Sequence, residues 1–429
     1  MSTLEAAVPP APAPITGPIA GPTAGTVRFF GDGRSYWRLL IRGAVLLMFT
    51  LGIYRFWLAT DIRRFLWSGI ELSGDSFEYT GTAAELLQGF LMALAILVPL
   101  YSVFFIVALG GGVIGDTSGL LSFVLLTLLG HYAIYRARRY RLTRTVFRGI
   151  RFHQTGSAWR YAICALFWWS LTILTLGLAF PAAQARLERF KMRHTFFGNQ
   201  PGRFDGSASR LLLRGILLWV LAVVPLTVGL VATFASVDWT TLGSLGGLGN
   251  EALLTWLVAN GIAAATLYLL LTLLWLLLSL LLLYPIFHAM FLRWWASGLR
   301  FGDIVVTSKL RTGRIYGIYL RFLWYAFLWT MAGIVVGSIG AVVIGAIVGD
   351  NVTILGEIFA TTAAIGLYVA MALGYSTIYQ ATVKLGVWRC VVDTLEVANT
   401  AVLDRVSAAG EPSSPVGEGL ADALNVGGI

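Results

Sequence analysis

The sequence predicts an all-α polytopic membrane protein, built from internally duplicated helical hairpins with short β-hairpins at the cytoplasmic surface. Two observations support this prediction. Of the 429 residues, 57% are hydrophobic and only 12% are charged, whereas soluble proteins carry about 25% charged residues. The basic residues are also confined to segments between long apolar runs. This composition excludes a soluble globular enzyme, a disordered chain and a collagen-like chain.

Six apolar runs predict membrane-spanning helices, which need about 20 mainly apolar residues. These runs are Phe90–Leu109, Leu120–Tyr135, Ile216–Ala235, Leu254–Phe287, Leu323–Val348 and Ile358–Tyr379. The fourth run is too long for one simple crossing. We expect it to tilt, to project beyond the bilayer or to break near Asn260-Gly261.

The basic residues predict how these spans are oriented. All 31 Lys and Arg residues lie in the segments 28–64, 136–160, 186–214, 293–321 and 384–405. The connections 110–119, 236–253 and 349–355 contain none. Basic segments remain on the cytoplasmic side. We therefore expect a multipass protein of the bacterial inner (plasma) membrane, with three hairpins and both termini in the cytoplasm.

Two further apolar runs leave the number of crossings open. Leu39–Trp57 is interrupted by Arg42 and Arg55, and Tyr161–Ala185 contains Thr175-Leu176-Gly177. Each run lies between two basic segments, so each is expected to enter and leave on the same side. We predict re-entrant or interfacial helices there. The alternative is eight full crossings with one basic loop outside.

An internal duplication organises the chain. Phe30–Leu100 matches Phe152–Leu226, and a third, degenerate copy begins at Leu299. Thr50-Leu51-Gly52 in the first copy corresponds to Thr175-Leu176-Gly177 in the second. The predicted parts are a disordered Pro/Ala-rich leader (1–27), membrane repeats at 28–150, 151–298 and 299–383, and a cytoplasmic C-terminal tail (384–429).

The basic linkers contain short alternating strands around turns, which predict β-hairpins. We expect Ile70–Leu72 to pair with Phe77–Tyr79, Phe196-Phe197 with Arg203-Phe204, and Ile304–Thr307 with Arg314–Tyr316. Val387–Val397 is predicted to add a further strand. These hairpins would lie at the cytoplasmic membrane surface.

Several motifs resemble those of a known family. They are the Thr-Leu-Gly motif with its Arg-rich continuation, the segment Arg148–Phe152 and the tail Gly417–Leu424. Together they resemble the YjgN-like family of bacterial inner-membrane proteins, which is defined by a domain of unknown function. The resemblance covers about Phe29 to Leu424 and implies location and architecture. It brings no established substrate, cofactor or catalytic residue. The chain departs from the family pattern at Ala182-Ala183, where an aromatic residue is more usual.

Motifs for enzyme chemistry are not found in the sequence. The four histidines belong to no HExxH pattern, and no Lys-Ser/Thr pair follows the glycine-rich stretches as a phosphate loop requires. Cys164 and Cys390 lie in no metal-ligand spacing. We therefore expect no enzymatic activity, no catalytic residue, no metal and no cofactor.

Polar residues inside a membrane are costly to insert and are therefore candidates for function. The candidate transport path consists of Asn260, Glu357, His131 and His288. Each has a simpler interpretation. Glu357 suits the start of a helix, Asn260 could bond a neighbouring helix, and the histidines could be interfacial hydrogen-bonding residues.

Arginines beside aromatic residues and glycines recur in the linkers and form a candidate site for anionic lipid headgroups. The candidates are Arg63, Arg64, Arg148, Arg151, Arg189, Arg193, Arg300 and Arg314. The alternative is that they only set the topology and anchor the protein to lipid.

Two functional hypotheses follow. The first is a transporter or exporter of a small amphipathic or anionic molecule that passes between the repeats. The second is a non-catalytic scaffold or adaptor that binds anionic lipid or a protein partner at the cytoplasmic face. In both, membrane lipid is the expected partner, and nucleic acid is not.

Overall fold

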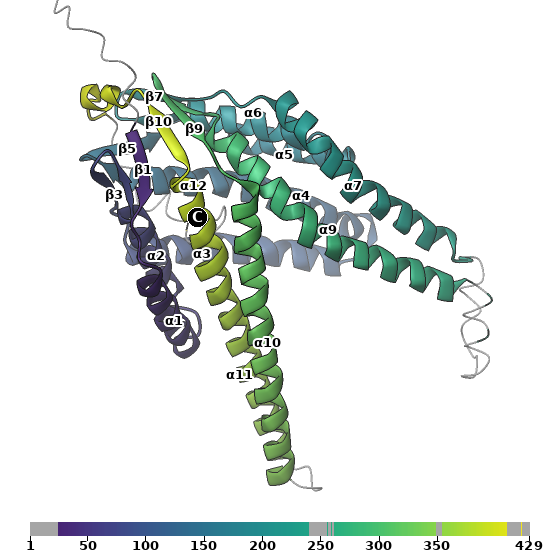
Figure 1. Ribbon diagram of the computed structural model, residues 1–429. Coiled ribbons are helices and arrows are strands. Elements are labelled where there is room, and N and C mark those ends of the chain that lie inside the picture. The colour runs from purple at the N-terminus through teal and green to yellow at the C-terminus, as the bar shows by residue number, and fades with distance from the viewer. Residues whose placement is uncertain are drawn as a thin grey trace, which may run out of the picture.

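The computed structural model describes residues 25–239, 255, 259, 261–348, 354–409 and 422, without the side chains of residues 113, 114, 116 and 355. A small β-barrel lies at one end of the molecule, and helical hairpins diverge from it (Figure 1). Most of the predicted leader, Asn260 and the end of the predicted C-terminal tail (410–421 and 423–429) lie outside the described residues.

The barrel is closed and antiparallel, with the strand order β1-β10-β9-β8-β7-β6-β5-β4-β3-β2. The strands are β1 (Gly25–Phe29), β2 (Ile70–Leu72), β3 (Asp75–Tyr79), β4 (Thr145–Phe147), β5 (Ile150–Gln154), β6 (Thr195–Phe197), β7 (Gln200–Phe204), β8 (Leu299–Phe301), β9 (Ile304–Ser308) and β10 (Leu395–Ala398). The predicted all-α class is therefore wrong. The strands have three to five residues each and are scattered between helices, so no local pattern reveals that they close into one barrel.

The predicted β-hairpins are partly confirmed. β2–β3 and β6–β7 pair where the sequence predicts them. β9 contains the predicted strand Ile304–Thr307, but it pairs with β8, and Arg314–Tyr316 lies in a helix instead. Of Val387–Val397, only the last residues belong to a strand. β1 and the β4–β5 hairpin were not predicted.

Helical hairpins connect the strands and leave the same end of the barrel. They are α1 (Gly33–Phe49) with α2 (Arg55–Ser68), α3 (Ala83–Leu109) with α4 (Gly112–Thr143), α5 (Ala158–Leu174) with α6 (Phe180–Arg193), α7 (Ala208–Ala235) with α9 (Ile262–Ala296), and α10 (Thr312–Val348) with α11 (Ile354–Tyr379). A π-helical turn, η2 (Gln380–Lys384), and α12 (Leu385–Val392) then lead to β10, which the 3-10 helix η3 (Thr400–Arg405) follows. We call each succession of strand, helical hairpin and strand a unit, so that β1–β2 is the first unit and β9–β10 the fifth.

Short polar residues fix where the helices begin. The Asp32 carboxylate accepts hydrogen bonds from the backbone N–H groups of Arg34 and Ser35 at 3.2 and 3.0 Å. Thr82 and Ser207 cap α3 and α7 in the same way. Such caps satisfy backbone donors that have no partner within the helix. α1, α3 and α7 therefore start just after a strand ends.

The Thr-Leu-Gly motifs form the tips of the two short hairpins. Leu51 and Gly52 have φ angles of 48° and 90°, and Leu176 and Gly177 have 49° and 94°. These left-handed angles, which favour glycine, reverse the chain between α1 and α2 and between α5 and α6. Both short hairpins therefore leave the barrel and return to it, as the re-entrant hypothesis requires.

Six described helices are long and apolar enough to cross a membrane: α3, α4, α7, α9, α10 and the stretch that begins with α11. They contain five of the six predicted spans in full and residues 262–287 of the fourth, so the protein is a membrane protein. α9 begins directly after Gly261, whose φ of 74° is left-handed. Most of the predicted run before Gly261 lies outside the described residues, so the break stays a prediction. At most 11% of the apolar window of any of these helices is buried inside the protein.

Aromatic side chains fill the barrel. The rings of Phe77 and Phe147 lie 4.5 Å apart, and those of Phe152 and Phe197 lie 4.6 Å apart. Phe301 completes the layer, 6.0 Å from Phe152. The members of each strand-paired couple are opposite one another in register, so their side chains share the inner face. The barrel is therefore a packed core.

One arginine recurs six residues before the second strand of every unit. Each of these arginines donates from Nη2 to the loop that starts the next unit. The acceptors are Gly81 O for Arg64 (3.1 Å), Gly156 O for Arg139, Gly206 O for Arg189 (2.9 Å), Thr312 Oγ1 for Arg293 (3.3 Å) and Gly31 O for Arg389. We call this set the arginine ring, because its fifth member returns to the first unit.

The glycines in these loops allow the loop backbone to pack closely against neighbouring aromatic rings. A Cβ atom at Gly31, Gly81 or Gly206 would clash with the aromatic ring two residues earlier, at the end of the preceding strand. In the contact that closes the ring, the Arg389 guanidinium also lies 5.5 Å from the centre of the Phe29 ring. The Phe29 N–H donates to Asp393 Oδ1 at 2.9 Å. α12 is thus bonded to the first strand.

We predict that Arg189→Ala destabilises the fold by about 1.5–3 kcal/mol, since a hydrogen bond from a charged donor is lost at a seam between units. Arg203→Ala is the matched control, because that side chain is 73% exposed and pairs only at the surface with Asp205; its effect should stay within about 0.5 kcal/mol. Denaturant unfolding in detergent measures both. Equal losses would contradict a structural role for the ring.

Candidate functional site

A cluster of charged side chains lies where the last turns of α2, α4 and α6 meet the barrel. We call it the charged cluster; its members are Arg63, Arg138, Arg141, Glu188, Lys191 and Asp422. Four cations face two carboxylates, a net charge of +2 among these six residues. Buried charges are stable only when they are paired and hydrogen-bonded, so the contacts within this cluster decide what it can do.

Asp422 occupies the first half of the charged cluster. Its carboxylate forms a bidentate pair with Arg63, in which Nη2 and Oδ1 are 3.0 Å apart, and Arg141 Nε lies 3.5 Å from Oδ1. The exposed fractions of the Arg63 and Asp422 side chains are 4% and 1%. Arg63 also donates to the Tyr79 hydroxyl at 3.0 Å. Burial alone would lower the pKa of Arg63, but Asp422 and Tyr79 raise it above its ordinary value.

The second half of the cluster is built around Lys191. Its ammonium group donates to Glu188, one turn earlier in α6. Arg138 donates to Thr195 Oγ1 at 2.8 Å and to Gln154 Oε1 at 3.2 Å. Burial lowers the pKa of Lys191; Glu188 opposes this shift, and the positive charge of Arg138 adds to it. This half therefore joins α4, α6 and the barrel by polar contacts.

Sequence reasoning did not single out Asp422 or the cluster as a whole. Asp422 lies in the tail motif that carried the family resemblance, and that motif was the one available signal. The tail is 359 residues from Arg63 in sequence, so spacing could not pair them.

The eight predicted headgroup arginines do not converge on one site. Arg64 and Arg189 belong to the arginine ring, and Arg63 to the charged cluster. The others are placed as follows: Arg148 pairs with Asp75 and Asp404 at 2.6 and 2.9 Å, Arg151 donates to Thr143 O at 3.4 Å, Arg300 donates to Val306 O at 3.0 Å, and Arg193 and Arg314 are exposed. Their binding of anionic headgroups stays a prediction.

The candidate transport residues lie on different hairpins. His131 is on α4 and His288 on α9, where its Nδ1 lies 2.9 Å from the Tyr319 hydroxyl. Glu357 is exposed in the first turn of α11, and Asn260 lies outside the described residues. The hairpins diverge from the barrel (Figure 1). A shared transport path through these residues also stays a prediction.

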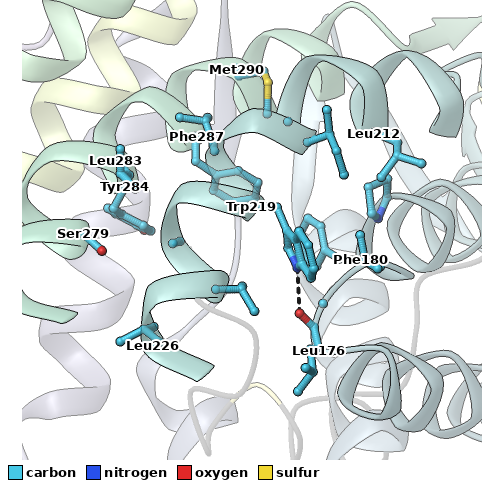
Figure 2. A pocket seen from close by; sticks show the side chains of 18 of the residues that line it. Leu176, Phe180, Leu212, Trp219, Leu226, Ser279, Leu283, Tyr284, Phe287 and Met290 are labelled. Atoms are coloured by element: carbon cyan, nitrogen blue, oxygen red, sulfur yellow. Dashed lines mark hydrogen bonds between the residues drawn. The ribbon is translucent and has the colours of Figure 1, made fainter. Parts of the chain in front are cut away.

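An apolar groove lies between the tip of the α5–α6 hairpin and the helices α7 and α9 (Figure 2). Its volume is about 430 Å³, within the range of about 300–1,000 Å³ typical of ligand pockets. Its walls include Leu176, Phe180, Trp219, Leu226 and Phe287. Almost all of its surface is hydrocarbon or aromatic.

Two local features shape the apolar groove. The Trp219 Nε1–H donates to Leu176 O at 2.8 Å, so the Thr-Leu-Gly tip is held against α7 (Figure 2). Gly215, on the wall, leaves space that a side chain would fill; a Cβ there would lie 3.2 Å from Met290 Cε. The groove is therefore a consequence of a short hairpin that stops beside two long helices.

Two buried donors on α9 lack partners. Ser279 Oγ, in the groove wall, and Trp275 Nε1, one turn earlier, have no hydrogen bond to any residue that the structure describes. Nearly all buried polar atoms in proteins are hydrogen-bonded. A bound molecule with an acceptor atom could satisfy Ser279.

A second groove is basic. It lies between α1, α10 and the η2–α12 segment and has a volume of about 540 Å³. Its polar walls contain Arg314, Arg321 and Arg389 with the carboxylate of Asp393, and Trp37 is among its aromatic residues. We call it the basic groove. Among the described residues, no three His, Cys, Asp or Glu side chains gather as they would around a metal ion.

We predict that Asp422→Asn costs about 3–5 kcal/mol of stability, because it leaves the guanidinium groups of Arg63 and Arg141, whose side chains are only 4% and 14% exposed, beside a neutral group. Asp404→Asn removes an ion pair whose carboxylate is 75% exposed and should cost at most about 1 kcal/mol. The double variant Arg63→Met/Asp422→Leu should recover most of the loss. Thermal unfolding of the purified protein measures the stability of all three variants. An Asp422→Asn variant as stable as the unmodified protein would contradict a stabilising role for the buried ion pair.

No curated protein matches the chain, and no solved structure matches it either. A bacterial protein family of unknown function, DUF898, matches residues 24–423 and thus covers the barrel, all the described helices and Asp422. The YjgN-like resemblance of the sequence motifs is thereby confirmed. The chain is a member of this family of bacterial proteins of unknown function (DUF898).

Proposed function

We propose that this membrane protein binds an amphipathic molecule and holds the molecule's hydrocarbon chain in the apolar groove. The groove itself is the observation on which the proposal depends. The proposed role is non-enzymatic and needs no cofactor. Of the transporter or exporter hypothesis, the proposal keeps only the binding of the transported molecule, a step that any transporter requires.

The position of the groove supports a hydrocarbon occupant. Its walls on α7 run from Leu211 to Leu226, about 22 Å along the helix axis at 1.5 Å per residue. One leaflet of the hydrocarbon core is about 15 Å deep, half of about 30 Å. The part of this wall from Ile216, where the predicted span begins, to Leu226 is about 15 Å long, so a chain lying along it would stay within one leaflet. The unpartnered hydroxyl of Ser279 would then meet a polar atom of the bound molecule.

A second candidate is the non-catalytic scaffold. The observation in its favour is the exposure of the spanning helices, whose apolar windows are at most 11% buried within the protein. Their free faces could contact lipid or the spans of another membrane protein. In this role the barrel would hold the hairpins at fixed directions, and anionic lipid or a protein partner would bind at the cytoplasmic face.

Filling the groove should abolish binding of a hydrocarbon chain. Gly215→Leu and Ala222→Trp place side chains into the groove, and Leu213→Trp changes a side chain that is 75% exposed on the same helix. A fatty acid with a photoreactive group near its methyl end, added to the purified protein, is the probe. We expect the two filling variants to lose at least about tenfold in crosslinking, which corresponds to 1.4 kcal/mol.

The control Leu213→Trp should crosslink like the unmodified protein, at groove peptides identified by mass spectrometry. Equal crosslinking by all three variants would contradict the proposal and leave the scaffold as the better candidate. Ser279→Ala should reduce crosslinking less than the filling variants, because it removes one hydrogen bond and leaves the space.

We propose the inner membrane as the location, with the barrel in the cytoplasm, since the barrel side carries the basic residues. After Cys164 and Cys390 are replaced by Ala, single cysteines are introduced at Asn199, in a barrel turn, and at Leu109, at the far end of α3. A membrane-impermeant maleimide should label Leu109→Cys in spheroplasts, and Asn199→Cys only after lysis. The reverse pattern would overturn the orientation.

A further inference from the structure

We infer that the basic groove binds a phosphate group carrying two negative charges, as in a phosphate monoester. The inference is independent of the apolar groove and of the function proposed for it. The basic groove lies where the fifth unit meets the first, and residues of α1, α10, η2 and α12 line it.

The charges in the groove match such a ligand. Three arginines and one aspartate line it, a net charge of +2. Arg389 already donates to Gly31 O, just after β1, and Asp393 already accepts a hydrogen bond from the Phe29 N–H of β1. Arg314 and Arg321 are exposed. A phosphate monoester carries about −1.5 to −2 at pH 7, and guanidinium groups bind phosphate oxygens in pairs.

The spacing of Arg314 and Arg321 lets both reach one group. They are seven residues apart on α10 and therefore lie on one face, about 10 Å apart along the axis. Gly317 lies between them on the same wall, and Gly33 of α1 contributes to the opposite wall. A Cβ atom at either glycine would meet no atom within 4 Å. The two glycines thus leave open space in the groove beside the arginines.

Residues of η2 and two aromatic rings complete the lining of the groove. Ala381 and Thr382, in the π-helical turn η2, line it, and π-helical turns are frequent at functional sites. The rings of Trp37 and Tyr325 meet edge to face, 6.5 Å apart. These rings add an apolar part to the lining beside the arginines.

The depth of the groove suits a headgroup at the membrane surface. α10 has 37 residues and is about 55 Å long, whereas the hydrocarbon core is about 30 Å thick. Its apolar part begins near Leu323, so the segment from Arg314 to Arg321 lies on the barrel side of the hydrocarbon. Both a lipid phosphate and a water-soluble phosphate could reach it.

The other units provide a matched control. Arg160 of α5 and Arg210 of α7 are, like Arg314, the third residue of their helix, and both are exposed. Neither lines the basic groove. Removing Arg160 and Arg210 therefore changes the net charge as much as removing Arg314 and Arg321 does, but leaves the basic groove intact.

The test uses the full-length purified protein in two arms. In the first, it is equilibrated in mixed micelles of phosphatidic acid, which has a phosphate monoester, and phosphatidylglycerol, whose phosphate is a singly charged diester. Native mass spectrometry then measures which lipid is retained. In the second, thermal unfolding is followed as inorganic phosphate is added, with sulfate at the same ionic strength as the comparison.

We expect one of two results. Selective retention of phosphatidic acid identifies a lipid ligand, and thermal stabilisation by inorganic phosphate but not by sulfate identifies a water-soluble ligand. Arg314→Gln/Arg321→Gln should lose the response by at least about tenfold, and Arg160→Gln/Arg210→Gln should keep it. Gly317→Leu fills the open space without removing charge, improves helix propensity and should also lose the response. No response in either arm, or an equal response from the two double variants, would overturn the inference.

Discussion

Closure of the barrel between β1 and β10 is the constraint on which the remaining structure depends. Gly25 lies opposite Val397, so strands near the two ends of the chain are neighbours. Strands of three to five residues contribute few hydrogen bonds each, and an open sheet would expose an unpaired edge at each side. A closed barrel has no edge. Until the chain brings its last strand back to its first, β1 and β10 each keep one unpaired edge.

The arginine ring transmits this closure to the membrane helices. Each guanidinium belongs to a helix that returns to the barrel and bonds the loop from which the next hairpin departs. The direction of one hairpin is thus fixed relative to the next. The shared position of the five arginines explains why part of the basic content recurs so regularly in the linkers. Positive charge near a membrane also orients the spans, so one residue type serves topology and assembly together.

Both grooves lie at seams between consecutive units. The apolar groove separates the short α5–α6 hairpin from the long α7–α9 hairpin, and the basic groove separates the fifth unit from the first. At these seams a hairpin that stops early, or a pair of glycines, leaves space that a regular ring of equal units would fill. The charged cluster, by contrast, is filled by the protein itself, since Asp422 pairs there with Arg63.

The sequence by itself determined what depends on neighbouring residues. Long apolar runs identified the six spans, and alternation around turns found β2–β3 and β6–β7. Tertiary structure alone decided the barrel, the acceptors of the arginine ring, the partner of Asp422 and the two grooves. These features join residues far apart in the chain, 364 positions in the bond from Phe29 to Asp393. No periodicity along the chain encodes such a contact, because it exists only once the barrel has closed.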